Sequence, residues 1–540
     1  MLSKKNIARI DQKNWLLGFA CLHIILAIIG CIKGYSPVPY SDMWSAVESI
    51  LQIDSGNKSA WWAQHNEHRI IISRLLFWLD FKLFAGKFIF LSVTHYLLAG
   101  AIFLCLALFA REAFSDKSQK DSCFKIQIII LLLSFSWMQK GNFVWTFQSQ
   151  FFFAQIFPLF SFYALYQHYK NEKISWFFLA IISATLSLGS MANGVIVPAL
   201  LAILSLLLRQ KLWKSFLLSS FAYVSLLLFF NGYQAAEGHV FLRDSLFRDP
   251  FGFTRFLLDY LGGPFFYLSG KGLRPLATIG GIALIAGATH HLFLALKNPK
   301  KSALNFSLLM FLLYIGATAI AVTDGRLDFG YKQATTGRYM TGSLAAWSVL
   351  LILYAPFLEK YRQAEIIKRG IFFLLPILLL PVQLDALRSQ QQKHFEQQVA
   401  LISLALAIPD REQQTGYLHL EITKKIEKIT HDAIAQKLGI FADPILQNIP
   451  MLGTRANPVI AWKKASYEGK IDSKTEIALA PDFFRISGEL NLDIENPPKA
   501  LTITDHENKI IGYAITGDQG KEHGFKGYLR KDAGENLRFQ

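Results

Sequence analysis

The sequence predicts an all-α membrane domain that crosses the bilayer many times, followed by a smaller C-terminal α+β domain. Of the 540 residues, 52% are hydrophobic and only 17% are charged, whereas about 25% are charged in an average soluble domain. Apolar runs of about 20 residues, the length that crosses a bilayer, recur up to residue 388. From residue 389 onward these runs stop, and short segments with alternating apolar residues appear near the C-terminus.

The first domain, residues 1–388, is expected to cross the membrane about eleven times. Its first apolar run ends at Ile32 without a small-residue cleavage site, so we interpret it as an uncleaved span. The segment 70–84 is short and carries Arg74, Asp80 and Lys82, which favours an interfacial helix. The predicted spans are residues 15–32, 88–110, 125–139, 150–167, 176–190, 194–208, 215–231, 276–296, 303–322, 340–357 and 370–387.

The distribution of Lys and Arg supports this number of spans. The net charge is +16, and the basic residues concentrate in the N-terminal tail and in short loops on one side, as cytoplasmic loops do. The longer loops and the C-terminal domain then share the periplasmic face of a bacterial inner membrane. No basic surface interleaved with aromatic residues is visible, so nucleic acid is not an expected partner.

The second domain, residues 389–540, is expected to lie in the periplasm. Its first part, 389–440, contains amphipathic stretches typical of a helical linker. Alternating apolar residues at 477–480, 484–487, 490–494, 500–504 and 510–515 predict strands, and Asp505-His-Glu-Asn508 is a plausible hairpin turn. We therefore predict a small β-sandwich over 470–540, with a scaffolding or acceptor-recognition role.

The first long loop concentrates acidic, imidazole and guanidinium groups at one membrane surface. Its candidate site residues are Asp42, His65, Glu67, His68 and Arg69. Holding ionisable groups beside a bilayer costs free energy, so such groups more often form a substrate site than a surface without a function. Asp42 lies just past a span, where a carboxylate can accept a proton from an acceptor hydroxyl.

The last long loop adds further candidates at the same level. Arg326 and Arg338, with His68 and Arg69, suit a diphosphate or phosphodiester, because the guanidinium fork pairs with phosphate oxygens at two points. Trp44 and Tyr339, together with Trp61 and Trp62, could stack on a sugar or on prenyl units, and Gln148 lies near the same end of two spans.

Each candidate also has a purely structural interpretation. Asp42 precedes a predicted helix and could cap it. Trp61 and Trp62 could anchor the chain at the membrane interface. Glu67 could form an ion pair with Arg69 or Arg74, and Arg326 could form one with Asp328. Arg338 could contact lipid head groups, His65 could be solvated, and Gln148 could serve helix packing.

This pattern resembles the GT-C superfamily of multi-span glycosyltransferases that use polyprenyl-phosphate-linked sugars. In that fold the first span is followed by a long external loop with interfacial helices, which opens with an acidic catalytic base. Asp42 occupies that position, and 43–53 and 70–84 match the interfacial helices. The strings Ser41-Asp42-Met-Trp44, His65-Asn-Glu-His-Arg69 and Gly325–Gly330 with Arg338-Tyr339 are similar to those of a loosely defined group of bacterial polytopic membrane proteins.

The resemblance implies an inverting glycosyltransferase with Asp42 as general base. Its donor would be a polyprenyl-phosphate-linked sugar, and its acceptor an envelope glycan, lipid or protein. Members of the superfamily often carry an acidic pair, whereas Met43 follows Asp42 here. No cofactor is therefore expected; a divalent cation is the alternative.

Other functions stay open at this point. An O-antigen polymerase or ligase also has about a dozen spans, although its charged residues usually lie in a late loop. A transporter of a lipid-linked substrate should carry charged residues within its spans, and few occur here apart from His23 and His95. A non-catalytic membrane assembly protein that anchors the external domain is the third alternative.

Overall fold

A computed structural model describes most of the chain and divides it into two compact units. Unit 1 comprises residues 1–32, 61–75 and 91–388, and unit 2 comprises 33–60, 76–90 and 389–540. Most of the first long loop therefore groups with the C-terminal region. The described residues are 12–114, 119–234, 242–268, 272–360, 364–420, 424–455, 467–491, 498–517, 523–534 and 537–540.

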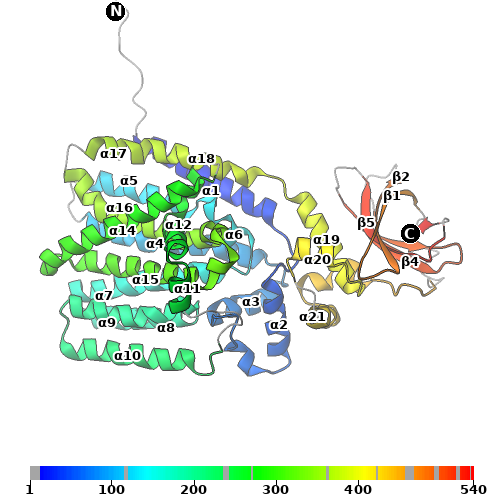
Figure 1. Cartoon of the computed structure of the whole chain (residues 1–540), viewed down its shortest axis with the longest axis horizontal. Coiled ribbons are helices and arrows are strands. Elements are labelled where there is room, and N and C mark those ends of the chain that lie inside the picture. The colour runs from blue at the N-terminus through cyan, green and yellow to red at the C-terminus, as the bar shows by residue number, and fades with distance from the viewer. Residues whose placement is uncertain are drawn as a thin grey trace, which may run out of the picture. The chain divides into compact units, whose positions relative to one another are not determined.

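Unit 1 is helical, and most of its long helices run roughly parallel (Figure 1). Its α-helices are α1 (Gln12–Gly34), α4 (Ile89–Ala113), α5 (Lys120–Ser134), α6 (Lys140–Val144), α7 (Ser149–Asn171), α8 (Ile174–Leu188), α9 (Val197–Leu207), α10 (Leu212–Phe230), α11 (Leu242–Arg248), α12 (Pro250–Leu261), α13 (Gly263–Leu268), α14 (Arg274–Lys297), α15 (Ala303–Arg326), α16 (Met340–Lys360), α17 (Glu365–Arg369) and α18 (Leu375–Leu384). Short helical turns join them, namely η3 (Trp137–Gln139), η4 (Ala192–Ile196), η5 (Pro299–Lys301), η6 (Leu327–Phe329), η7 (Tyr331–Thr335), η8 (Gly337–Tyr339), η10 (Gly370–Leu374) and η11 (Asp385–Leu387).

Unit 2 combines helices with one β-sheet. Its helical elements are α2 (Met43–Asp54), α19 (Gln391–Ala405), α20 (Arg411–Leu418), α21 (Lys424–Ala435), η12 (Gly439–Ala442) and α22 (Pro444–Gln447). Its strands are β1 (Glu468–Glu476), β2 (Phe483–Asn491), β3 (Ala500–Thr504), β4 (Ile510–Thr516), β5 (Gly524–Arg530) and β6 (Arg538–Phe539). Helices η1 (Lys58–Trp61) and α3 (Ile71–Leu83) contribute residues to both units, as do the end of α1 and the start of α4.

Eight helical segments of the described chain are long and apolar enough to cross a membrane, so the chain is a multi-pass integral membrane protein. They are Gln12–Gly34, Ile89–Ala113, Lys120–Val144, Leu212–Phe230, Arg274–Lys297, Ala303–Phe329, Gly337–Lys360 and Ile366–Leu387.

Three of the eleven predicted spans do not meet these criteria, and they fall on α7, α8 and α9. Helix α8 and the apolar segment Ala192–Leu207 are short, and α7 carries His168, Lys170 and several glutamines. The polar side chains of α7 find partners on neighbouring residues, as when Gln167 donates to Glu112 at 3.0 Å. The length of an apolar run alone did not distinguish α7, α8 and α9 from the eight candidate spans.

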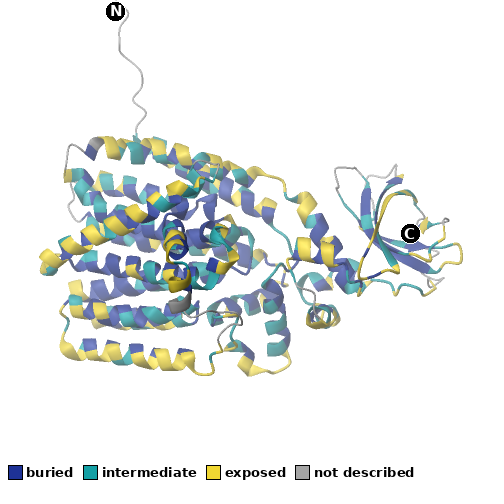
Figure 2. Ribbon diagram, in the orientation of Figure 1, coloured by how far each residue is buried: buried dark blue, intermediate teal, exposed yellow. Residues whose placement is uncertain are grey.

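Helix α10 shows why the fold needs a bilayer. Its buried residues are small or recur on one face: Ser215, Leu218, Ala222, Ser225 and Phe229. The remaining surface is apolar yet exposed (Figure 2), with Leu212 at 82% and Phe216 at 75% exposure. An apolar patch of this extent is costly in water and is expected against lipid.

Glycines let α12 and α14 pack at backbone contact. A Cβ atom on Gly281 would lie 2.2 Å from the Leu258 carbonyl oxygen, and one on Gly262 would lie 1.8 Å from the Ala277 carbonyl oxygen. Small residues at helix contacts allow this close approach in membrane proteins. The segment 232–275, which connects the predicted spans 215–231 and 276–296 and was expected to be an external loop, is partly helical. Helix α12 within it buries Phe253, Phe256 and Tyr260 in unit 1.

Polar contacts join distant segments at one end of unit 1. Gln383 donates to the His23 carbonyl at 2.7 Å and accepts from the Trp137 amide at 2.9 Å. The Lys140 ammonium pairs with Asp385 at 2.6 Å. These contacts hold α1, η3 and the start of α6 against the end of α18.

The first part of the long loop is a packed component of unit 2. Helix α2 contacts α21, with Glu48 paired to Lys425 at 2.8 Å. The Trp44 ring is 1% exposed, meets Phe441 edge-on at 5.8 Å, and donates from Nε1 to the Pro39 carbonyl at 2.9 Å. Loop residues 33–60 are thus fixed by the helices after residue 389.

The C-terminal strands form a single antiparallel sheet rather than the predicted sandwich. The strand order is β1-β2-β5-β4-β3-β6, and the sheet curls into a half-barrel (Figure 1). An isolated bridge joins Tyr467, before β1, to Phe539 of β6. One face encloses its own apolar core, which includes Ile486, Leu501, Ile503, Phe525 and Leu529, so no second sheet is needed to cover it.

Alternation predicted the strands β2, β3 and β4 but missed the edge strands β1 and β6 and the central strand β5. Segments 484–487, 500–504 and 510–515 lie in β2, β3 and β4. The predicted hairpin turn is present, and the Asp505 carboxylate accepts from the Glu507 and Lys509 amides at 2.9 and 2.8 Å. Segment 477–480 instead follows β1, whose own residues are mostly polar and exposed.

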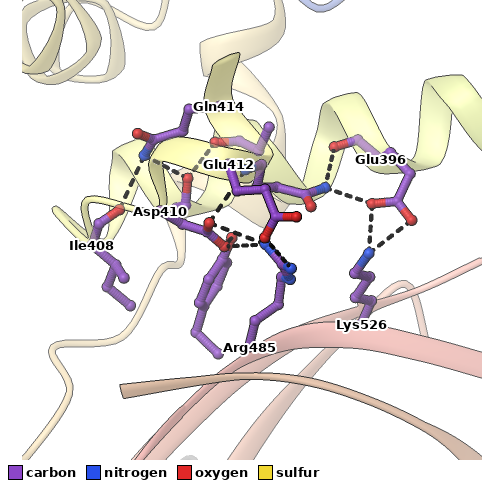
Figure 3. Close-up of polar contacts among 11 residues, drawn as sticks. Glu396, Ile408, Asp410, Glu412, Gln414, Arg485 and Lys526 are labelled. Carbon is purple, nitrogen blue, oxygen red and sulfur yellow. Dashed lines mark hydrogen bonds and ion pairs between the residues drawn. The ribbon is translucent and has the colours of Figure 1, made fainter. Parts of the chain in front are cut away.

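Opposite this core, ion pairs and a hydrogen bond join the sheet to α19 and α20 (Figure 3). We call the residues that form them the helix–sheet cluster: Glu396, Asp410, Glu412, Arg485, Lys526 and Tyr528. Arg485 binds both Asp410 oxygens at 3.0 Å and Glu412 at 2.9 Å. Lys526 pairs with Glu396 at 2.7 Å, and the Tyr528 hydroxyl donates to Asp410 at 3.0 Å.

Candidate functional site

The segment 61–70 of unit 1 is held in place by two buried arginines. Arg74, on the first turn of α3, donates to the carbonyls of Trp61 at 2.7 Å and Ala63 at 3.1 Å. Arg69 donates to the Trp62 carbonyl at 2.8 Å, and both arginines are 3% exposed. Their positive charges therefore meet the partial negative charges of a loop backbone that no regular secondary structure satisfies.

Arg69 also ties this loop to the end of α10. Its Nε atom donates to the Phe229 carbonyl at 3.1 Å, and Nη2 donates to the Asn231 carbonyl at 2.8 Å. The guanidinium lies 4.8 Å from the centre of the Trp62 ring. All three guanidinium nitrogens of Arg69 are thus bound to backbone oxygens. Arg69, which the sequence predicted to bind phosphate, therefore has an extensive structural role.

A tight turn presents His65, Glu67 and His68. The amide of each histidine donates to the carbonyl of the other, at 2.8 and 2.9 Å. Asn66 adopts a positive φ of 49°, a conformation that asparagine tolerates better than most residues. The His65 ring packs 4.9 Å from the ring of Phe147, which places this turn beside the segment that precedes α7.

His68 is held as a neutral imidazole. Its Nδ1 accepts from the Ala192 amide at 3.3 Å, so the ring proton belongs on Nε2, which lies 4.0 Å from Glu67 Oε1. Burial is the main cause that lowers the pKa of His68 to about 4, and the nearby charges of Arg326 and Arg338 lower it further. The imidazole can therefore donate a hydrogen bond at neutral pH.

Arg326, at the end of α15, approaches the same turn. Its Nη2 atom lies 3.9 Å from Glu67 Oε1, and its guanidinium lies 5.6 Å from the Phe329 ring centre. The alternative pairing with Asp328 is not observed, because Asp328 pairs with Arg248. Arg326 thus joins the first loop to the last at a distance longer than a normal hydrogen bond.

Arg338 lies in η8, at the other end of the last loop. Its Nη2 atom donates weakly to Gln333 at 3.4 Å, and its guanidinium lies 5.0 Å from the Tyr339 ring centre. Its Nε atom is buried and has no hydrogen-bond partner among the residues that the structure describes. We call His65, Glu67, His68, Arg326 and Arg338 the loop cluster.

Behind Arg338 lies a buried polar network that the sequence analysis did not identify. Asn142 donates to the Arg338 carbonyl at 2.8 Å and to the Thr341 hydroxyl at 2.7 Å. That hydroxyl donates in turn to Gln139 at 2.6 Å. Amide side chains next to an apolar span were the available signal, because such groups are seldom buried there without a partner.

Two further candidates are buried in unit 1. Tyr339 is 6% exposed, and its ring lies 6.2 Å from that of Phe151 and 5.4 Å from that of Tyr260. Gln148 is 1% exposed, and its Oε1 atom has no hydrogen-bond partner within the described residues. Of the two side chains, Tyr339 contacts the Arg338 guanidinium.

Asp42 and Trp44 belong to unit 2. Asp42 immediately precedes α2, but its side chain makes no capping hydrogen bond, so the capping interpretation is not supported. Trp44 lies in the core described above. The predicted roles of Asp42 as a base and Trp44 as a stacking surface stay predictions.

The loop cluster is chemically suited to an anion. Two guanidinium groups and a neutral imidazole donor converge on it from segments far apart in the sequence, and Glu67 supplies the nearby carboxylate. Among the described residues, no three His, Cys, Asp or Glu side chains are grouped as metal ligands. Comparisons with protein-family models, curated proteins and solved structures find no match for this chain.

Proposed function

We propose that this integral membrane protein is a glycosyltransferase that moves a sugar from a polyprenyl-phosphate donor to an envelope glycan, lipid or protein acceptor. In the proposal the reaction takes place at the periplasmic face of a bacterial inner membrane. The observation that carries it is the loop cluster, where Arg326 and Arg338 lie near His68 and neither guanidinium has a carboxylate within 3.5 Å among the described residues.

Phosphate chemistry explains why such arginines matter. In the proposed step the acceptor oxygen attacks the anomeric carbon and loses its proton to a general base, the role predicted for Asp42. The bond between that carbon and the phosphate oxygen breaks, and its electron pair leaves with the phosphate. The donor phosphodiester carries one negative charge and the released monoester carries two, so cations placed beside it stabilise the transition state more than the ground state.

The position at a helix-bundle end supports a lipid donor. A polyprenyl chain must stay in the hydrocarbon layer while its phosphate stays at the surface, and the loop cluster lies at the ends of membrane-spanning segments. Arg326 directly follows the apolar part of α15, and Arg338 directly precedes α16. Both guanidinium groups are therefore expected at the depth of a lipid phosphate.

Substitution of Asp42 tests the proposed base. A deletion strain that expresses Asp42→Asn at wild-type abundance should lose the envelope glycan modification, measured by mass analysis of envelope glycans. Asp54→Asn makes the same chemical change at a residue paired with Lys82 and should retain the modification. Wild-type modification with Asp42→Asn would overturn the assignment of the base.

Arg338→Lys tests the phosphate contact separately. A two-point contact to phosphate needs the guanidinium fork, and Lys cannot reproduce it, whereas a cation that only reaches the head groups tolerates this change. We therefore expect weaker use of the donor with Arg338→Lys. An unchanged dependence on donor concentration would remove Arg338 from the proposed site.

A further inference from the structure

A groove between α4 and α5 lies at the opposite end of unit 1 from the loop cluster. The groove lies at the end of α4 and the start of α5, and it has a volume of about 810 Å³. The span Lys120–Val144 begins there and ends beside Asn142, which contacts Arg338. With a rise of 1.5 Å per residue, that span separates the two sites by roughly the thickness of a bilayer core.

The lining of the groove is apolar with a basic end. Its apolar lining includes Phe103, Leu104, Leu108 and Phe124, and Arg111 and Lys120 lie at the end where α4 stops and α5 starts. Both basic side chains are exposed, and neither forms a hydrogen bond or ion pair with another described residue. None of the described residues that line the groove is acidic.

A second cavity at this end provides a contrast. Its volume is about 650 Å³, and its lining includes Lys170, Lys300 and Lys301 but also Glu112 and Glu172. Glu112 already binds Lys170 at 2.6 Å. The carboxylates of this second cavity would repel an anion. The described lining of the groove between α4 and α5 contains two basic residues and no carboxylate.

We infer that the groove between α4 and α5 binds a phospholipid with an anionic head group. One acyl chain would lie along Phe103, Leu104 and Leu108, and the phosphate would contact Arg111 and Lys120. The volume falls within the range of about 300 to 1,000 Å³ that is typical of ligand pockets. Arginine and lysine at the membrane surface attract anionic lipids, and the guanidinium fork matches phosphate geometry.

This inference is independent of the proposed transferase activity. It concerns the other end of the helix bundle and none of the loop-cluster residues. A bound phospholipid in this groove requires only that it stabilise the fold. If the proposed transferase activity were disproved, the lipid site would be unaffected.

Native mass spectrometry of the full-length protein in detergent tests the inference. Phosphatidylglycerol and phosphatidylcholine are added at equal concentration, and bound lipid is counted on the intact protein. We expect the wild type to retain phosphatidylglycerol preferentially. The double variant Arg111→Ala/Lys120→Ala should retain at least about five-fold less of it.

The matched control is Arg209→Ala/Lys211→Ala, which removes the same charge from the connection between α9 and α10 and leaves the groove intact. It should bind phosphatidylglycerol as the wild type does. Equal losses in the two double variants, or equal retention of the two lipids by the wild type, would overturn the inference.

Two further experiments distinguish the contribution of the acyl chain from that of the head-group phosphate. Leu104→Trp partly fills the groove without changing charge, and it should lower retention of phosphatidylglycerol because the acyl chain loses space. Soluble glycerol phosphate should fail to displace the lipid. Complete displacement by glycerol phosphate, or no effect of Leu104→Trp, would contradict a lipid in the groove.

Discussion

Arginines of the two units have very different partners. In the helix–sheet cluster of unit 2, Arg485 binds Asp410 and Glu412, and each of these contacts is 3.0 Å or shorter (Figure 3). In the loop cluster of unit 1, Arg326 lies 3.9 Å from Glu67, and Arg338 donates to Gln333 at 3.4 Å. The first arrangement consumes the charge of the arginine, and the second leaves it available.

The difference separates structural charges from candidate functional charges. A buried cation with two carboxylates stabilises an interface, and removing it leaves unpaired carboxylates. A cation held by ring contacts and a long hydrogen bond keeps donors for a ligand. Arg69 follows the first pattern although it lies beside the loop cluster, because three backbone carbonyls occupy it.

The largest expected effect is on the helix–sheet cluster. Arg485→Ala would leave Asp410, whose side chain is 3% exposed, without its cation, and the expected loss of stability is about 3 to 5 kcal/mol. Resistance of the C-terminal region to limited proteolysis in the full-length protein measures it. Arg538→Ala, at an exposed position in β6, should leave resistance unchanged; equal resistance of both variants would contradict the comparison.

Arg338→Ala should show the reverse pattern. We expect the proposed transfer to fall by at least about 10²-fold, as when a transition-state donor is removed, with a change in stability below about 1 kcal/mol because no close carboxylate loses a partner. Transfer and thermal unfolding are measured on the same preparation. The control is Arg248→Ala, which removes the cation paired with exposed Asp328. A large loss of stability with Arg338→Ala would place this arginine in the structural class.

His68 should make unit 1 sensitive to acid. Its pKa is lowered from 6.5 to about 4 by burial first, within a cluster that contains Glu67, His65, Arg326 and Arg338. The unfolded chain therefore binds more protons between these pH values, and stability decreases as pH falls from 6.5 toward 4, by up to about 3 kcal/mol. Thermal unfolding at a series of pH values should show a flatter acid limb for His68→Gln; identical limbs would exclude His68 as its source.

Asp80 of unit 2 should act in the opposite sense and with the smallest effect. Burial raises its pKa from 3.8 to about 7, so the folded chain binds more protons and stability decreases as pH rises through this window. Asp80→Asn should therefore stabilise the protein by about 1 to 2 kcal/mol at pH 8. Thermal unfolding measures the change, and Asp54→Asn, which breaks the pair with Lys82, should give no gain. A lower midpoint for Asp80→Asn would contradict this prediction.

The extent of prediction differed between local and distant features. Apolar runs predicted the eight segments that qualify as spans, and alternation predicted the hairpin at Asp505, because both depend on neighbouring residues. The edge strand β1 was missed because its sequence is polar and exposed, and the central strand β5 was also not predicted. Helices α11, α12 and α13 were missed in a segment taken as a loop, where contacts of α12 with α14 stabilise helix packing.

The candidate residues show the same limit. The sequence alone placed titratable groups in the first and last long loops. It could not distinguish Arg69, which binds the carbonyls of Phe229 and Asn231, from Arg326, which lies 3.9 Å from the Glu67 carboxylate. It also gave no indication that the Arg338 carbonyl would be bound by Asn142, nearly 200 positions earlier.

By itself, the sequence determined that this chain belongs in a membrane and ends in a β-rich region, because hydropathy and periodicity are properties of short segments. Only the tertiary structure decided that the strands form one curled sheet, that residues 33–60 pack with the C-terminal helices, and which arginines keep free donors. The physical reason is that the partners of a long side chain come from segments brought together by folding, and no local pattern specifies them.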